Sequence, residues 1–147
     1  LLEYAATLEE IYGFVKTYAK RKVLLGGDLN AKLGGTTDHV LVGPSVPRGN
    51  LRPQERERAS LIVEFVANLG LIVANTFADC NHEHLMTTRS NWSGQGTEEQ
   101  IDFVLASANL LLAEANVEQY LYGDTDRRLA SCEFTVDAPM ENVAPKI

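Results

Sequence analysis

The chain has 147 residues, of which 45% are hydrophobic and 22% charged, a composition typical of one globular domain. Its formal net charge of −7 argues against a protein that binds DNA through a basic surface alone. No apolar stretch approaches the length of a membrane span, so we expect no membrane partner.

The N-terminal part of the chain predicts a helix, a short strand and a long loop. Over residues 1 to 20, apolar side chains recur at helical spacing and predict an amphipathic helix. The apolar run within residues 22 to 27 predicts a short buried strand. Residues 34 to 50 are rich in Gly, Thr, Pro and Ser, which predicts a surface loop.

A second helix and a series of strands are expected after this loop. Pro53 suits the start of a helix, and Gly70 suits its end. Residues 71 to 74 then predict a second buried strand. Further strands are expected at 84 to 88, 100 to 105, 115 to 121 and 129 to 136.

This order of elements predicts the fold class. Helices and strands alternate first and strands follow, which indicates an α+β domain with a largely antiparallel sheet and helices on one face. We find no internal linker, and we expect an irregular tail from about residue 137. The two cysteines, Cys80 and Cys132, are too few for a disulfide framework and favour an intracellular location, including the nucleus.

Several polar residues interrupt or follow the apolar strands. In "KVLLGGDLNAKLGG", Asp28 and Asn30 follow an apolar run, and side chains two apart on an extended chain face the same side. Asp102 stands within "QIDFVLAS", where a buried carboxylate costs several kcal/mol unless it is paired or bound to a metal. The alternative is a surface-facing position on a half-exposed strand. Asp126 lies in "YGDTDRRLA", between two expected strands.

Four segments in order, "GGDLNAKLG", "LGLIVANTF", "MTTRSNWSGQGTEEQIDFVL" and "GDTDRRLASCEF", resemble a known family. They are similar to the endonuclease/exonuclease/phosphatase family, the fold of deoxyribonuclease I and the apurinic-site repair endonucleases. The resemblance is greatest to the endonuclease domains of non-LTR retrotransposon polyproteins and their craniofacial-development-like relatives. It covers residues 1 to 136 and implies part of a four-layer α/β/β/α sandwich of the deoxyribonuclease I-like type.

The resemblance implies a phosphodiesterase that uses Mg²⁺ or Mn²⁺ to nick DNA, linked to a reverse transcriptase in the ancestral polyprotein. Such hydrolysis needs an activated water, neutralised phosphate charge and a stabilised leaving oxygen. By resemblance, Asp28 would activate the water, and Asn30 would hold it or a phosphate oxygen. Asp126 would bind the metal ion, which prefers carboxylate oxygen. Asp102 would orient a final histidine, and Thr87 would contact the phosphate.

The chain departs from the family pattern at the final Ser-Asp-His. Arg127 stands at the position of the histidine. Arginine binds phosphate well but does not release a proton near neutral pH. If the histidine transfers a proton, its loss costs about 10²–10⁴-fold in rate. We expect Arg127 to contact phosphate and to pair with Asp102.

A second departure concerns the residues that the family places before the Gly-Asp-x-Asn turn. These include its first asparagine and its metal-binding glutamate. Residues 1 to 27 offer no counterpart, because Glu3, Glu9 and Glu10 lie on the predicted helix. We therefore expect residues 1 to 147 to be the C-terminal portion of the domain, with an incomplete metal site and no activity in isolation. Its partners would be DNA and the missing N-terminal half.

Two other functions stay open at this point. One is a non-catalytic binding or remnant domain, and the other is a phosphatase of the same fold. The stretch "CNHEH" at residues 80 to 84 has no second ligand cluster at a usual zinc-finger spacing, so it does not predict a zinc site.

Overall fold

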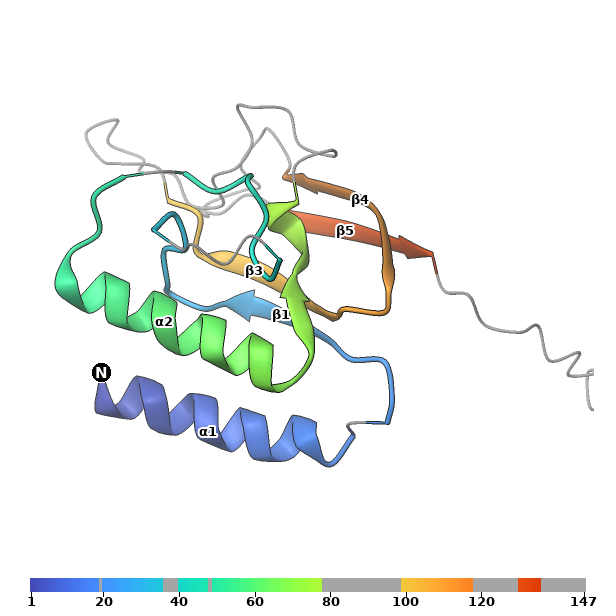
Figure 1. The fold of residues 1–147 in the computed structure, drawn as a ribbon, viewed down its shortest axis with the longest axis horizontal. Helices are drawn as coiled ribbons and strands as arrows, with labels where there is room; N and C mark the ends of the chain where they lie inside the picture. Colours follow the sequence, from blue (N-terminus) through green and yellow to red (C-terminus); the bar gives the residue numbers. More distant parts are fainter. Residues whose placement is uncertain (19, 36–39, 48, 78–98, 118–129, 136–147) are drawn as a thin grey trace, which may run out of the picture.

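The structure, a computed structural model, describes residues 1–18, 20–35, 40–47, 49–77, 99–117 and 130–135. These residues form an α+β fold with antiparallel sheets, as the order of elements predicted (Figure 1). In chain order the elements are α1 (Leu2–Lys16), β1 (Leu24–Asp28), α2 (Pro53–Asn68), β2 (Leu71–Val73), the 3₁₀ turn η1 (Ala74–Thr76), β3 (Asp102–Ser107), β4 (Leu111–Val117) and β5 (Ala130–Thr135). Neither described helix is long and apolar enough to cross a membrane.

The strands form two antiparallel groups. Three strands pair in the order β1-β3-β2, and β4 pairs with β5 in a separate ribbon. β3 is therefore the central strand of the larger sheet, while β1 and β2 lie at its edges within the described residues.

The main core lies between the two helices and one face of the sheet. Alternate residues of β3, Phe103 and Leu105, pack there with Ile62 and Phe65 of α2. α1 adds half-buried side chains to the same cluster, Tyr4 among them. Burial of such large apolar side chains is the main stabilising contribution to a domain of this size.

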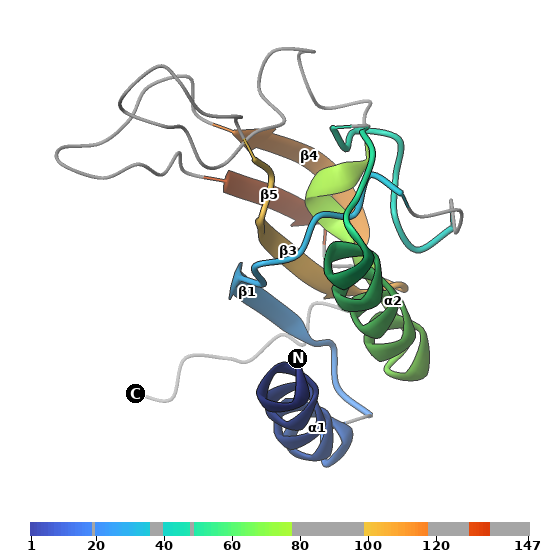
Figure 2. The same cartoon turned by 90° about the vertical axis from the view of Figure 1, so that its left-hand side faces the viewer.

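The opposite face of β3 packs on smaller side chains. Val104 and Ala106 face a second cluster, to which the β4–β5 ribbon contributes Leu112, Cys132 and Phe134. Figure 2 shows β1 and β3 between α1 at one end and the ribbon at the other. The helices thus lie on one face of the sheet, as expected.

Local chemistry marks both ends of α2. Pro53 occupies the first turn of α2, and the Glu55 carboxylate accepts a 2.8 Å hydrogen bond from the Arg52 backbone N–H. Gly70, which follows the C-cap Leu69, has φ +63, a left-handed conformation that glycine adopts at low cost. α1 ends at Lys16, earlier than the predicted residue 20.

The prediction of a buried strand at residues 22 to 27 was wrong about burial. Within the part of the chain that the structure describes, β1 is an edge strand, Leu24 is 57% exposed, and Gly26, Gly27 and Asp28 are exposed. An apolar sequence alone does not distinguish a central strand from an edge strand, because the order of strands is set by tertiary pairing.

The loop prediction for residues 34 to 50 was also wrong in part. Val42 and Val46 are buried, and Val42 forms an isolated parallel bridge with Val73. β3 and β4 are displaced by a few residues from the predicted strands at 100 to 105 and 115 to 121. The predicted strand at 84 to 88 and the tail from about 137 lie outside the described residues.

Candidate functional site

The register of β1 and β3 places two predicted site residues opposite each other. Asp28, the last residue of β1, pairs with Asp102, the first residue of β3. Facing residues in antiparallel strands have Cα atoms about 4.5–5.5 Å apart. Asp28 is exposed, and Asp102 is half-buried. Two segments far apart in sequence therefore bring their carboxylates to one corner of the sheet.

The chain turns directly after Asp28. The Leu29 N–H donates a 2.9 Å hydrogen bond to the Ile101 carbonyl, and Asn30 then adopts φ 44. Asparagine tolerates this left-handed conformation better than most residues. The Asn30 N–H donates a 2.8 Å hydrogen bond to the Asp28 carboxylate, which forms a local side-chain turn.

This turn corrects one step of the sequence reasoning. We expected Asp28 and Asn30 to face the same side because an extended chain alternates its side chains. The chain is not extended at Asn30, so that alternation does not apply. Their proximity comes instead from the hydrogen bond between the Asp28 carboxylate and the Asn30 backbone.

Asn75, for which the sequence predicted no role, supports the corner from within. Its side chain is fully buried in η1. The Asn75 Nδ2 group donates to the Asp102 carbonyl at 3.1 Å, and its Oδ1 atom accepts from the Val104 N–H at 2.9 Å. Asn75 thus fixes the backbone on both sides of Phe103. The signal in the sequence was an asparagine directly after a short apolar strand.

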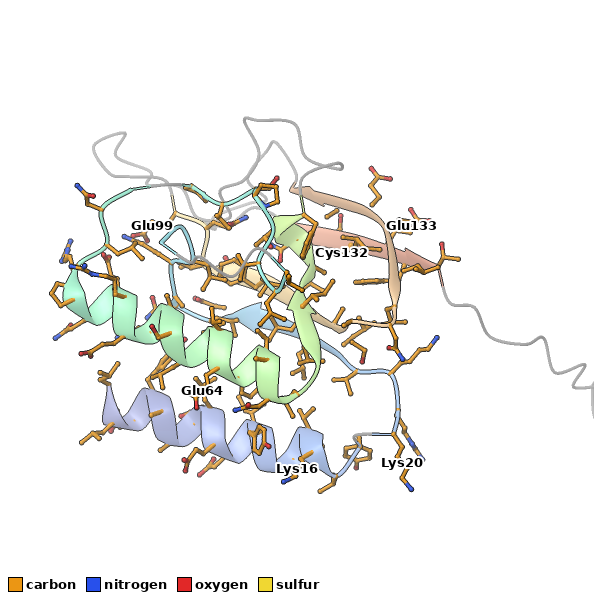
Figure 3. The ribbon with its side chains drawn as sticks, in the orientation of Figure 1. Lys16, Lys20, Glu64, Glu99, Cys132 and Glu133 are labelled. Carbon is orange, nitrogen blue, oxygen red and sulfur yellow. The ribbon has the colours of Figure 1, made fainter. Side chains whose placement is uncertain are left out.

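A charged cluster lies close to the turn in sequence. The Lys32 ammonium is 2.9 Å from carboxylate oxygens of both Glu55 and Glu99. The hydrogen bond to Glu55 is the largest cause that raises the pKa of Lys32, followed by the bond to Glu99. The same bond to Lys32, and then the Arg52 N–H, lowers the pKa of Glu55. Figure 3 shows Glu99 beside the N-terminal end of α2, far from Cys132 and Glu133 on β5.

Two hollows in the described part of the chain are lined mainly by apolar side chains. One, of about 310 Å³, lies between α1 and α2, and the other, of about 120 Å³, lies between α1 and the sheet beside Gly26 and Gly27. Neither hollow includes Asp28 or Asp102 in its lining. They do not contribute to the carboxylate corner.

Three of the predicted site residues, Thr87, Asp126 and Arg127, lie outside the described residues. The predicted convergence of Asp126 with Asp28, and the predicted pairing of Arg127 with Asp102, therefore stay predictions. Within the described ranges, no group of three or more His, Cys, Asp or Glu side chains is arranged to hold a metal ion.

No model of a known protein family matches the chain, and no curated protein matches it either. The structure itself defines an α+β domain with two facing aspartates at the end of a strand pair. The family resemblance of the four segments stays a prediction.

Proposed function

We propose that this chain is the C-terminal portion of a deoxyribonuclease I-like domain of the endonuclease/exonuclease/phosphatase family. It would supply one corner of a metal-dependent phosphodiesterase site that nicks DNA, of the kind found in retrotransposon endonucleases. The observation that carries the proposal is the register that pairs Asp28 with Asp102. Asp28 and Asp102 were both candidate site residues in the sequence, and the register sets them opposite each other.

The facing aspartates are suited to this chemistry. Like charges directly opposite on neighbouring strands repel each other, and a nearby cation relieves that repulsion. Carboxylate oxygens are the ligands that Mg²⁺ prefers, so the donor chemistry of this corner is compatible with the ion. When bound, Mg²⁺ would neutralise the charge on a phosphate. Asp126 is the residue that we propose as its ligand, together with a glutamate from outside this chain.

The residues at the corner would have separate roles. Asp28 is exposed, so its carboxylate is accessible to a water molecule and can accept a proton from it. Asn30 would hold that water or a phosphate oxygen through its side-chain amide. Asp102 would orient the group at position 127, where an arginine binds phosphate without transferring a proton. Thr87 would add a hydroxyl donor to the phosphate.

A plasmid-nicking assay tests this proposal. The purified chain alone, in Mg²⁺, should leave supercoiled plasmid intact. The chain co-expressed with the N-terminal half of an intact family member, which carries the metal-binding glutamate, should nick it. Asp28→Ala should abolish this nicking, whereas Glu114→Ala, which removes an exposed carboxylate on β4, should leave it unchanged.

Equal nicking by the Asp28→Ala and unmodified pairs would contradict the proposed role of the corner. Robust nicking by the chain alone that depends on Asp28 would instead contradict the proposal that the chain is only part of the domain, because it would show a metal site complete without the added half. A second candidate function is a non-catalytic remnant that keeps the fold, and Arg127 at the position of the histidine favours it. A soluble, folded pair that does not nick DNA under any metal condition would support that candidate.

A further inference from the structure

Two side chains from different helices bind the turn that follows Asp28. The Tyr4 hydroxyl of α1 donates a 2.6 Å hydrogen bond to the Leu29 carbonyl. Arg58 of α2 donates from Nη1 to the Asn30 carbonyl at 3.2 Å. The Arg58 guanidinium also lies over the Tyr4 ring, 5.3 Å from its centroid. The two side chains therefore form one unit, the Tyr4–Arg58 pair, whose donors reach consecutive carbonyls of the turn.

The turn depends on such support because its own strand provides little. β1 is an exposed edge strand, and among the described residues it pairs only with β3. Asn30 is held at φ 44, a conformation that persists only where the surroundings fix it. The Ile101 carbonyl holds Leu29 from the side of β3, and the Tyr4–Arg58 pair holds the turn from the side of the helices.

The environment of the pair is consistent with a fixed arrangement. Burial raises the pKa of Tyr4 to about 12, although the Arg58 charge opposes this shift, so its hydroxyl stays a donor at neutral pH. The Arg58 Nε atom is buried and has no hydrogen-bond partner among the described residues. The contact with the Tyr4 ring and the Nη1 hydrogen bond to the Asn30 carbonyl are therefore what hold the Arg58 side chain.

We propose that Tyr4 and Arg58 are positioning residues that fix the Leu29–Asn30 turn and thereby the Asp28 carboxylate. The catalytic part of this inference rests on the proposed function, since Asp28 matters for rate only if it activates a water. The structural part does not, because the hydrogen bonds belong to the chain itself.

Amide hydrogen exchange in the purified chain tests the structural part. Tyr4→Phe removes one hydroxyl and keeps the ring, and it should speed exchange of the Leu29 and Asn30 amides by about 2- to 12-fold, as expected for one lost hydrogen bond. Arg58→Lys should speed the same exchange by a similar factor, because lysine lacks the planar guanidinium that stacks on the ring and at the same time donates to the carbonyl. Exchange of the amides within β2 and β3 should not change.

Matched controls come from the same helices. Tyr12→Phe removes a hydroxyl on α1 that has no hydrogen-bond partner in the described part of the chain, and Arg56→Lys alters an exposed arginine of α2. Neither should alter exchange at Leu29 or Asn30. The inference is overturned if Tyr4→Phe behaves like Tyr12→Phe, or if it speeds exchange equally throughout the chain.

Nicking kinetics of the co-expressed pair test the catalytic part. Tyr4→Phe and Arg58→Lys should lower kcat by about 10- to 100-fold with little change in KM, because a displaced catalytic group slows the reaction without weakening binding. A change in KM alone, or full activity in Arg58→Lys, would overturn the positioning role. If Asp28→Ala has no effect on nicking, the proposed function fails, and the exchange measurements still decide whether the pair fixes the turn.

Discussion

β1 and β3 pair residue for residue from Leu24–Ala106 to Asp28–Asp102, yet they differ in their surroundings. Among the described residues, β3 lies between two strands and buries Phe103 and Leu105, whereas β1 lies at an edge of the sheet and most of its residues are exposed. Each strand nevertheless contributes one aspartate to the corner. The two strands thus differ in what supports them at this corner: β3 packs in the core, and the turn after β1 accepts hydrogen bonds from helix side chains.

The largest expected difference between the strands is in stability. Phe103→Ala should lower the free energy of unfolding by about 3–5 kcal/mol, because the side chain is 1% exposed and leaves a cavity in the main core. Leu24→Ala should cost no more than about 1 kcal/mol, because that side chain is 57% exposed. Urea denaturation monitored by circular dichroism measures both. Similar losses in the two variants would contradict the contrast between a buried and an exposed strand.

A second prediction sharpens the contrast at Asp102. Asn75→Ala should lower the stability by about 2–3 kcal/mol, since it removes two hydrogen bonds to the β3 backbone and leaves partly buried backbone groups without this partner. Asn68→Ala, at an exposed position on α2, should change stability by less than about 0.5 kcal/mol. The same denaturation experiment compares them. A neutral Asn75→Ala variant would show that β3 does not need this support.

Glycines give a third comparison of edge and interior. A Cβ atom at Gly43 would clash with the backbone of Thr76 and Phe77, which packs directly against this buried glycine. The Gly43 N–H also donates to the Thr76 hydroxyl at 2.7 Å. Gly43→Ala should therefore cost about 1–3 kcal/mol. Gly26→Ala on β1 should be close to neutral, because a Cβ there would meet nothing within 4 Å. Thermal unfolding of the two variants tests this, and a destabilised Gly26→Ala would indicate that the edge of β1 is covered in solution.

Features set by local chemistry could be predicted from the sequence, and features set by tertiary contacts could not. Pro53 and Gly70 mark the second helix correctly because helix ends depend on local backbone chemistry. The apolar sequence of β1 does not predict its exposure, because an edge position depends on the order of strands in the sheet. The burial of Val42 and Val46 is likewise a tertiary effect, since the Ser45 N–H between them donates to the Thr76 carbonyl at 2.7 Å.

Some residues of the candidate site could likewise be predicted from the sequence, and others could not. Asp28 and Asp102 could be selected from sequence because a carboxylate beside an apolar run is unusual. The left-handed turn at Asn30, and its support by Tyr4 and Arg58, could not be predicted. They depend on two helices that contact the turn from 25 residues before Leu29 and 28 residues after Asn30. Asn75 was missed because its role requires knowledge of the strand it supports.

The smallest expected effect concerns the charged cluster of Lys32, Glu55 and Glu99. Through Lys32 and Glu99 it connects the segment after β1 with the segment before β3. Glu55→Gln removes one of the two ion pairs of Lys32 but keeps an oxygen to accept from the Arg52 N–H. Because these groups are partly exposed, the loss at pH 7 should be no more than about 1 kcal/mol, and 1 M salt should reduce it. Glu57→Gln, on the same helix and without an ion pair in the described residues, is the matched control.

The dependence of this effect on pH distinguishes an ion pair from simple packing. The pKa of Glu55 in the folded chain lies below its ordinary value of 4.5. Its charge therefore stabilises the fold fully above about pH 4.5, and this stabilisation is lost as pH falls through the lower folded value. Wild type and Glu55→Gln should consequently differ in urea midpoint at pH 7 and converge in acid. A difference that persisted or grew in acid would show that Glu55 acts through its shape and not its charge. The ion pairs of Lys32 would then contribute little to the stability of the fold.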